Sequence, residues 1–301
     1  MDRAGADVSR FRAELRTITL WNLSLCLSTM GLVNGTQLLA QDLLVAAASD
    51  LAPAVPELTV QVKQNQSLTL RVSIGSSGQL ARQIEQGAPF DLFLSADENF
   101  VQQVVRAGRG DAASVRVYAV GRLALWSKSG KIQKLEDLAR PEVKRVAMAN
   151  PVHAPYGRLA KEALVRAGLW GVVEPKLVLA ETVRQTMQFA GTGNVDAALT
   201  SWTMAHDKGG VLLPDEMRQA GVVLKGAARG REAAALLAFL QSSGGELILR
   251  RHGLLAGRPA GGEAVAKDLK KNNGDGEDSG ANKEAKKPER LRPAKKRNKN
   301  Q

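Results

Sequence analysis

A chain of 301 residues is longer than one ordinary hydrophobic core needs, which predicts two domains. Its composition, 44% hydrophobic and 24% charged, is that of a globular protein, and an aromatic content of 4% argues against stacking on bases or sugars as the main activity. The net charge of +12 is typical of a nucleic-acid binder, but residues 258–301 carry a surplus of six positive charges and residues 1–41 a surplus of one, which leaves five for the segment between them.

The first 41 residues have the pattern of a signal peptide. Four arginines precede an apolar stretch at residues 20–33, and the small residue Ala40, before Gln41, offers a cleavage site. This stretch is shorter than the roughly 20 residues of a membrane-spanning helix, so we expect cleavage rather than a retained anchor. The only cysteine, Cys26, follows Leu25 instead of the small residue that a lipid-attachment site requires. The sequence therefore predicts export to the periplasm and a mature chain without a thiol ligand or nucleophile.

Between residues 42 and 257, short apolar runs alternate with amphipathic stretches, which predicts an α/β fold. The expected strands are residues 43–48, 68–74, 91–95, 117–127, 145–149, 176–180 and 197–200. The expected helices are residues 79–86, 98–106, 157–167, 181–190 and 201–205, with a closing helical region at 231–254. Gly87, directly after the first helix, is the residue type that favours a helix C-terminus.

The segment 258–301 is rich in Lys, Asn, Gly and Glu and has few large apolar residues. Such a composition buries too little surface to offset the entropy of ordering, so a disordered basic tail is expected. A solvated tail is the simpler interpretation. The alternative is an electrostatic tether that would make the chain a surface-binding or nucleic-acid-binding adaptor.

Four strand-to-helix turns carry small or hydroxyl residues where a helix is expected to begin. They are Ser49, Ser77, residues 155–157 and residues 182–183. Helix N-termini expose free backbone N–H groups and the positive end of the helix dipole, and in open α/β sheets such turns gather at the carboxyl edge of the strands. Each residue alone is adequately explained as a helix cap, but together the four turns predict an anion site.

Catalysis is not supported by the residues. The GSSGQ segment at 75–79 lacks the last glycine of a nucleophile elbow, and the three histidines are too widely spaced to form a metal-binding pair. Two acidic pairs, Glu136 with Asp137 and Asp215 with Glu216, lie in polar stretches and are expected to face water. We therefore expect no enzyme, no cofactor and no residue that ligates a metal directly.

Five segments, in this order and spacing, make the chain recognisable. They read VAAASDLAPAVPEL, IGSSGQLARQIEQGAPFDLFLSAD, ANPVHAPYGRLAKEALVRAGLW, LAETVRQTMQFAGTGNVDAAL and LILRRHGL. The series spans essentially all of residues 42–257 and resembles the periplasmic molybdate-binding proteins of molybdenum ABC transporters, which are type II periplasmic solute-binding proteins.

The resemblance implies a two-lobed fold in which each lobe is a mixed sheet flanked by helices and the chain crosses twice between the lobes. On this basis lobe 1 is expected at residues 42–118 and 214–257, and lobe 2 at residues 119–213. The ligand is expected in the cleft between the lobes. The resemblance also implies a monomer that delivers its ligand to the membrane permease of an ABC transporter.

The resemblance also implies five oxyanion-binding residues. Ser49 and Ser77 are expected to donate from both hydroxyl and backbone, and Tyr156 and Val183 from the backbone N–H. The fifth position, often a tyrosine in the family, falls on Ser201 in this chain. With the shorter serine at this position, either Ser201 reaches the anion through a water molecule or the Tyr156 hydroxyl compensates for the missing tyrosine.

The residues themselves fit a fully deprotonated oxyanion. Molybdate and sulfate need only hydrogen-bond donors, whereas phosphate keeps a proton at neutral pH and favours a site with an acceptor carboxylate. The expected contacts are uncharged donors, each worth roughly 1.5–3 kcal/mol to a charged acceptor. Asp50 and Glu181 lie beside them, and we interpret both as acids in the first turn of a helix. Molybdate and tungstate are the expected ligands, with sulfate or another oxyanion as the alternative.

Overall fold

The computed structural model describes residues 42–66 and 68–257. The predicted signal peptide at 1–41, with Cys26, and the predicted basic tail at 258–301 lie outside the described residues. Both therefore stay predictions.

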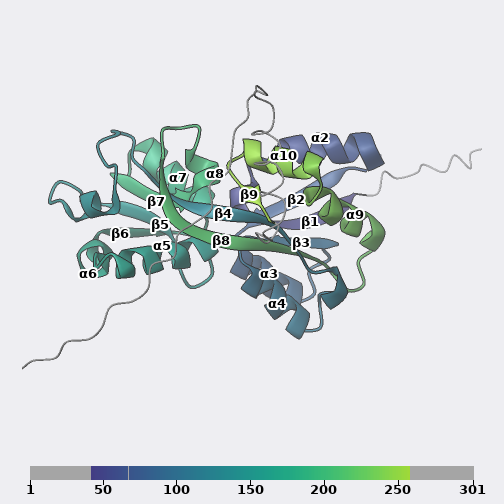
Figure 1. Ribbon diagram of the computed structural model, residues 1–301. Helices are drawn as coiled ribbons and strands as arrows, with labels where there is room; N and C mark the ends of the chain where they lie inside the picture. The colour runs from purple at the N-terminus through teal and green to yellow at the C-terminus, as the bar shows by residue number, and fades with distance from the viewer. Residues whose placement is uncertain (1–41, 67, 258–301) are drawn as a thin grey trace, which may run out of the picture. The chain divides into compact units, whose positions relative to one another are not determined.

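The strands of the described residues form one mixed sheet (Figure 1). They are β1 (Leu43–Ala48), β2 (Leu70–Gly75), β3 (Leu92–Ser95), β4 (Arg116–Trp126), β5 (Val146–Ala149), β6 (Leu177–Ala180), β7 (Ala197–Ser201), β8 (Val211–Val223) and β9 (Leu255–Ala256). Their order is β2-β1-β3-β8-β4-β7-β5-β6, with β9 paired to β4. The parallel pairs are β1 with β2 and β3, and β5 with β6 and β7, which leaves β4 and β8 as the antiparallel strands in the middle.

Helices connect most of these strands. The α-helices are α2 (Val55–Gln66), α3 (Ser77–Glu85), α4 (Glu98–Arg106), α5 (Pro155–Arg166), α6 (Trp170–Val173), α7 (Val183–Thr192), α8 (Trp202–Ala205), α9 (Gly230–Leu240) and α10 (Ser243–Arg251). Short 3₁₀ helices are η1 (Ser49–Leu51), η2 (Ala112–Ser114), η3 (Leu135–Ala139) and η4 (Glu174–Lys176). The predicted α/β class is confirmed, although helix α2 and strand β8 were not predicted.

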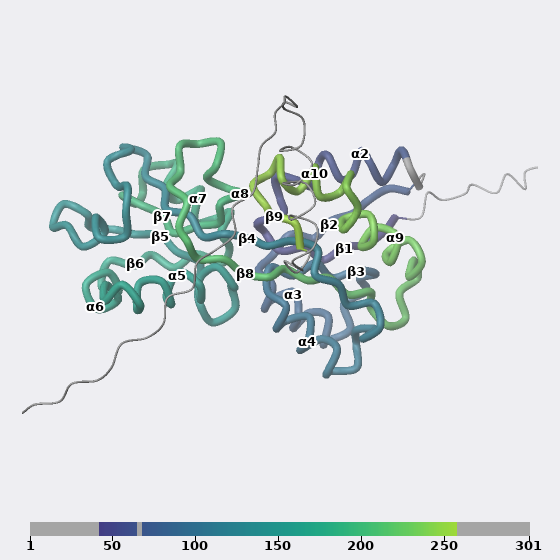
Figure 2. Tube along the Cα trace, in the orientation of Figure 1, coloured from purple at the N-terminus to yellow at the C-terminus, as the bar shows by residue number. Residues whose placement is uncertain are grey.

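The long strands β4 and β8 join the two ends of the sheet, as the trace in Figure 2 shows. Strand β8 pairs with β3 through residues 220–223, and β4 pairs with β7 through residues 123–126. The two crossovers that the fold requires are therefore strands, and the sheet is continuous rather than divided. The proposed lobe boundaries, at 118/119 and 213/214, fall inside these strands and stay a prediction.

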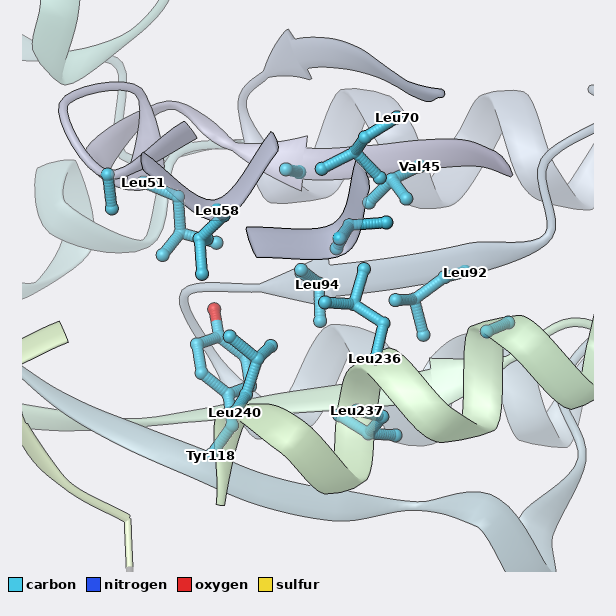
Figure 3. Close-up of a cluster of buried hydrophobic side chains, with 14 of the residues drawn as sticks. Val45, Leu51, Leu58, Leu70, Leu92, Leu94, Tyr118, Leu236, Leu237 and Leu240 are labelled. Carbon is cyan, nitrogen blue, oxygen red and sulfur yellow. The ribbon is translucent and has the colours of Figure 1, made fainter. Parts of the chain in front are cut away.

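Side chains that point alternately to the two faces of each strand divide the core into layers. In β1, Val45 belongs to a cluster with α2, α9 and α10 (Figure 3), whereas Ala46 belongs to a separate cluster with α3 and α4. In β5, Met148 packs into the cluster that includes α5, and Ala147 packs into the one that includes α7. Successive side chains point to opposite faces of a strand, so each sheet segment is covered by helices on both sides.

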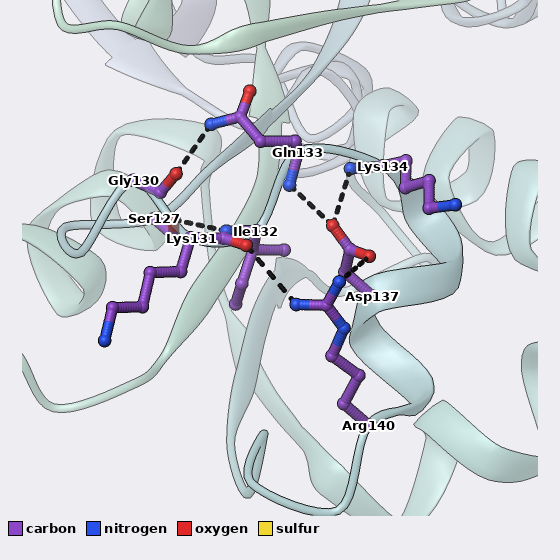
Figure 4. A network of polar contacts seen from close by, with 8 residues as sticks. All are labelled: Ser127, Gly130, Lys131, Ile132, Gln133, Lys134, Asp137 and Arg140. Carbon is purple, nitrogen blue, oxygen red and sulfur yellow. Dashed lines mark hydrogen bonds and ion pairs between the residues drawn. The ribbon is translucent and has the colours of Figure 1, made fainter.

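Two predictions about acidic residues are wrong. Asp137 is only 3% exposed, because its carboxylate accepts hydrogen bonds from the backbone N–H groups of Gln133 and Lys134 and pairs with Arg140 (Figure 4). Asp215 is 9% exposed and pairs with Arg166. Each carboxylate has partners that offset its burial, and the polar sequence around it did not reveal them.

Candidate functional site

A small buried cavity lies where four strand-to-helix turns meet. Four of the five predicted site residues line it: Ser49, Ser77, Tyr156 and Val183. The remaining lining residues are Ala48, Asp50, Gly75, Ser76, Ala96, Ala154 and Pro155, and the space among them is small, about 10 Å³ for the centres of water molecules. Neither Lys nor Arg is among these residues. The sequence-based prediction that these turns converge is therefore confirmed, while ligand binding by their residues stays a prediction.

Each turn places a helix start at the cavity. Strand β1 runs directly into η1 at Ser49, and β2 is followed by α3, which begins at Ser77. Helix α5 begins at Pro155, whose missing N–H costs nothing at a helix N-terminus, and α7 begins at Val183. The first turns of α3, α5 and α7 contain no acidic residue, so nothing within those turns neutralises the positive ends of their dipoles. The cavity therefore suits an anion.

The Ser77 side chain keeps a donor available. Ser77 is fully buried, and its Oγ accepts a hydrogen bond of 3.0 Å from the backbone N–H of Ala96. A serine hydroxyl that already accepts one bond still has its own proton to donate. The accepted bond also holds the side chain in place, so the donor is oriented before a ligand arrives.

A polar network adjoins the cavity at Asp50. Oδ2 of Asp50 accepts hydrogen bonds from the Tyr156 hydroxyl at 3.1 Å and from Nε2 of Gln219. The Tyr118 hydroxyl donates to Oε1 of Gln219 at 3.0 Å. The Tyr156 hydroxyl is thus engaged with Asp50, and it is the backbone of Tyr156 that belongs to the helix start.

Burial dominates the ionisation of this network. Desolvation raises the pKa of Asp50 to about 6, although hydrogen bonds from Gln219 and Tyr156 oppose the rise. Burial, with the nearby Asp50 charge, raises the pKa of Tyr118 and of Tyr156 well above the usual tyrosine value, so both stay neutral. Asp50 does lie in the first turn of η1, as expected, but its exposed fraction of 1% and its partners set it apart from an ordinary surface acid. The same expectation for Glu181 is wrong, because α7 begins at Val183 and Glu181 lies before its first turn.

Gly121 of β4 makes room for this network. A Cβ atom at this position would overlap the Tyr156 hydroxyl and Nε2 of Gln219. Only a residue without a side chain allows the two groups to approach the strand so closely. Asp50, Gln219 and Gly121 could not be associated from the sequence, because 169 residues separate Asp50 from Gln219.

His153 connects two of the turns at the edge of the cavity. Its Nδ1 lies 2.9 Å from the Ser76 hydroxyl, and its carbonyl accepts a bond of 2.9 Å from the Gly78 N–H. Its Nε2 lies 3.2 Å from Oε2 of Glu181, which also accepts from the Gln79 side chain. These contacts give His153 a structural role, because they hold two of the turns together.

Ser201 is not among the residues that line the cavity. It is fully buried at the end of β7, and its Oγ forms a hydrogen bond of 2.7 Å with the Thr203 hydroxyl. The resemblance implied a contact here, but this hydroxyl is bonded to a neighbouring side chain and does not reach the cavity lining.

Residues 42–66 and 68–257 contain no group of three or more His, Cys, Asp or Glu side chains that could hold a metal ion. Within the same ranges, no helix has the length and apolar character needed to cross a lipid bilayer.

The fold and the cavity at its helix starts define a class of binding proteins. Residues 43–255 match the model of the family described as bacterial extracellular solute-binding protein, and the chain belongs to that family. Type II periplasmic binding proteins are among its structural neighbours, which confirms the predicted fold class. Family membership also confirms that the chain is a binding protein and not an enzyme.

Several individual proteins of known sequence or structure are similar to this chain. The chain is 32% identical to the molybdate-binding protein ModA of Rhodobacter capsulatus over 222 residues, which are 71% of this chain and 88% of that protein. It is 29% identical to the putative ABC transporter substrate-binding lipoprotein YvgL of Bacillus subtilis, over 71% of this chain and 86% of that one. The solved periplasmic molybdate-binding protein of Azotobacter vinelandii superposes with a TM-score of 0.67 at 24% identity, over 71% of this chain and 99% of that chain.

Proposed function

We propose that this protein binds molybdate, and tungstate equally, in the cavity formed by Ser49, Ser77, Tyr156 and Val183. The observation that carries the proposal is the convergence of three helix N-termini without first-turn acids on a cavity lined by neither Lys nor Arg. A tetrahedral dianion matches such a set of donors, because every oxygen only accepts. The names of the relatives, molybdate-binding proteins at 32% and 28% identity, agree with this chemistry.

The assignment of donors follows from the turns. The hydroxyls of Ser49 and Ser77 and the backbone N–H groups at the starts of α3, α5 and α7 would surround the anion. Each donor to a charged acceptor contributes roughly 1.5–3 kcal/mol, and omitting Lys and Arg avoids the cost of burying their charges. Ser201 has no part in this proposal, because its hydroxyl is bonded to Thr203 outside the cavity lining.

The cellular role follows from the family. A bacterial extracellular solute-binding protein acts outside the cytoplasm, and residues 1–41 would supply the signal peptide for export to the periplasm. The protein, acting as a monomer, would then pass the anion to an ABC import permease.

Thermal unfolding of the full chain with molybdate, tungstate, sulfate or phosphate tests the ligand. A ligand that binds only the folded state adds about 4 kcal/mol of stability at a thousandfold excess over its Kd. We expect a raised melting temperature with molybdate and tungstate and none with sulfate or phosphate. A shift with sulfate alone would keep the oxyanion site and change its ligand, whereas no shift with any anion would overturn the proposal.

A further inference from the structure

The carboxyl group of Asp50 presents an electrostatic problem for a site that takes a dianion. Asp50 lines the cavity, is 1% exposed, and lies beside the proposed donor Ser49. Its Oδ2 accepts from both Tyr156 and Gln219, and the backbone N–H groups of Asp50 and Leu51 also face the carboxylate. Its Oδ1 is nevertheless buried without a hydrogen-bond partner of normal geometry among the described residues. An ionised carboxylate would therefore face a bound dianion at short range in a buried cavity, where like charges repel more strongly than in water.

The elements packed against Asp50 offer no cation that pairs with it. Helix α5 presents the Tyr156 hydroxyl, β4 the Tyr118 hydroxyl, and β8 the neutral amide of Gln219. Arg122 of β4 lies over the Trp202 ring, 5.9 Å from its centroid. No described salt bridge within 4.0 Å involves Asp50, whereas the buried acids Asp97, Asp137 and Asp215 each have one. Buried Asp91 also lacks a salt bridge, but both of its carboxylate oxygens accept backbone N–H groups.

The remaining charged groups near the cavity have their own partners or face solvent. Arg158 of α5 pairs with Asp97, and Arg184 of α7 is exposed. At the edge of the cavity, Glu181 is paired with His153, and α8 has no titratable side chain. The negative charge on Asp50 is therefore not balanced by a neighbouring side chain.

We infer that Asp50 takes up one proton from solvent when the oxyanion binds, so that the cavity captures anion and proton together. The proton belongs on Oδ1, because Oδ2 already accepts two hydrogen bonds. As a neutral acid, Asp50 becomes a donor like the other lining groups, and the charge added to the site falls from two to one. This inference rests on the proposed function, because it presupposes a fully deprotonated anion in the cavity.

The coupling also makes Asp50 a determinant of specificity. An oxyanion that carries its own proton, such as hydrogen phosphate, would donate to an ionised Asp50 and need no proton from solvent. A fully deprotonated anion needs the protonated acid. The number of protons taken up on binding therefore distinguishes the two classes of ligand.

Calorimetric titration of the full wild-type chain with molybdate measures this number from the difference in apparent enthalpy between two buffers, HEPES and Tris at pH 8, and MES and Bis-Tris near pH 6. Burial places the pKa of Asp50 at about 6, so we expect close to one proton per anion at pH 8 and about one-half near pH 6. Over pH 7 to 8.5 the affinity should fall by up to tenfold per pH unit. Binding of molybdate without proton uptake at pH 8 would overturn the inference.

Three variants assign the proton to its residue. Asp50→Asn keeps an acceptor for Tyr156 and Gln219 but cannot titrate, and we expect no uptake and no pH slope. His153→Asn and Glu181→Gln remove the other titratable groups at the cavity edge and should keep the wild-type slope. A slope lost in His153→Asn and kept in Asp50→Asn would assign the proton to the histidine and overturn the inference for Asp50. If the wild-type chain binds no molybdate at any pH, the result contradicts the proposed function itself and therefore also this inference.

Discussion

Two concave regions of this molecule differ in how they use charge. One is the small buried cavity at the helix starts, which is lined by serines, helix N-termini and Asp50. The other is a surface pocket of about 390 Å³ lined by Lys128, Lys131 and Arg140, of which Lys131 and Arg140 are drawn in Figure 4. The surface pocket has the positive charge, yet only the buried cavity has donors that converge from several elements.

The comparison of the two regions shows why a cluster of positive side chains does not by itself identify an anion site of this kind. The cationic pocket also contains Glu142 and Asp196, and Arg140 is already paired with Asp137. Its lysines are exposed, so water and salt screen them. Uncharged donors in a dry cavity need no counter-charge and are not screened, which lets a few of them bind a dianion.

The largest expected effect comes from moving a helix start. A Cβ on Gly157 would overlap the carbonyl of Ala149, so Gly157→Ala forces the first turn of α5 away from β5. We expect the chain to lose about 3 kcal/mol of stability and the cavity to lose measurable molybdate binding. Gly191→Ala, at a helical position in α7 with no atom within 4 Å of the added Cβ, should keep both. Calorimetry and thermal unfolding measure the two effects, and normal binding by Gly157→Ala would contradict the role given to α5.

Ser77→Ala removes one uncharged donor and leaves the others. We expect the binding free energy for molybdate to weaken by about 2 kcal/mol, since one hydrogen bond to a charged ligand is lost. Ser201→Ala is the matched variant, because this serine is equally buried but lies outside the cavity lining. Its affinity should stay within about 0.5 kcal/mol of the wild type. Equal losses in both variants, measured by calorimetry, would restore Ser201 to the site.

Asp50→Asn tests the buried charge without any ligand. Burial raises the pKa of Asp50 from 3.8 to about 6. Between these two values the folded state binds more protons than the unfolded state. The free energy of unfolding of the wild type therefore falls as the pH rises from about 4 to 6, and then levels off. Between pH 5 and 7.5 the wild type should therefore lose about 1 kcal/mol relative to Asp50→Asn. Urea unfolding at the two pH values measures this difference. A constant difference would show that Asp50 is not the titrating group.

The sequence predicts the helix starts at the cavity well, because their position follows from local rules. Ser49, Ser77 and Val183 each come within three residues of the end of a parallel strand, and the ends of such strands meet at one edge of a sheet. Helix α2, by contrast, is rich in Val and Thr, which favour strands, so its helical state depends on packing against the sheet.

Long-range polar contacts were beyond sequence reasoning. Strand β8 was missed because Pro214, Asp215 and Glu216 interrupt its apolar pattern, although Asp215 lies on the buried side with Arg166 as its partner. The network at Asp50 needs Gln219 from the same strand, and no local pattern connects the two. Residues that meet only in the folded sheet have no signature in a single sequence.

The smallest effect should come from the cationic surface pocket. Lys128→Gln and Lys131→Gln remove two exposed charges, and we expect the molybdate affinity of the double variant to change by less than about 0.5 kcal/mol at 0.15 M salt. The association rate, measured by stopped-flow mixing at low salt, should fall slightly, because the summed field of the protein acts on the approach of the anion. A tenfold loss of affinity would mean that the charged pocket holds the anion. The contrast drawn between the two regions would then be reversed, since screened surface charges would outweigh buried, oriented donors.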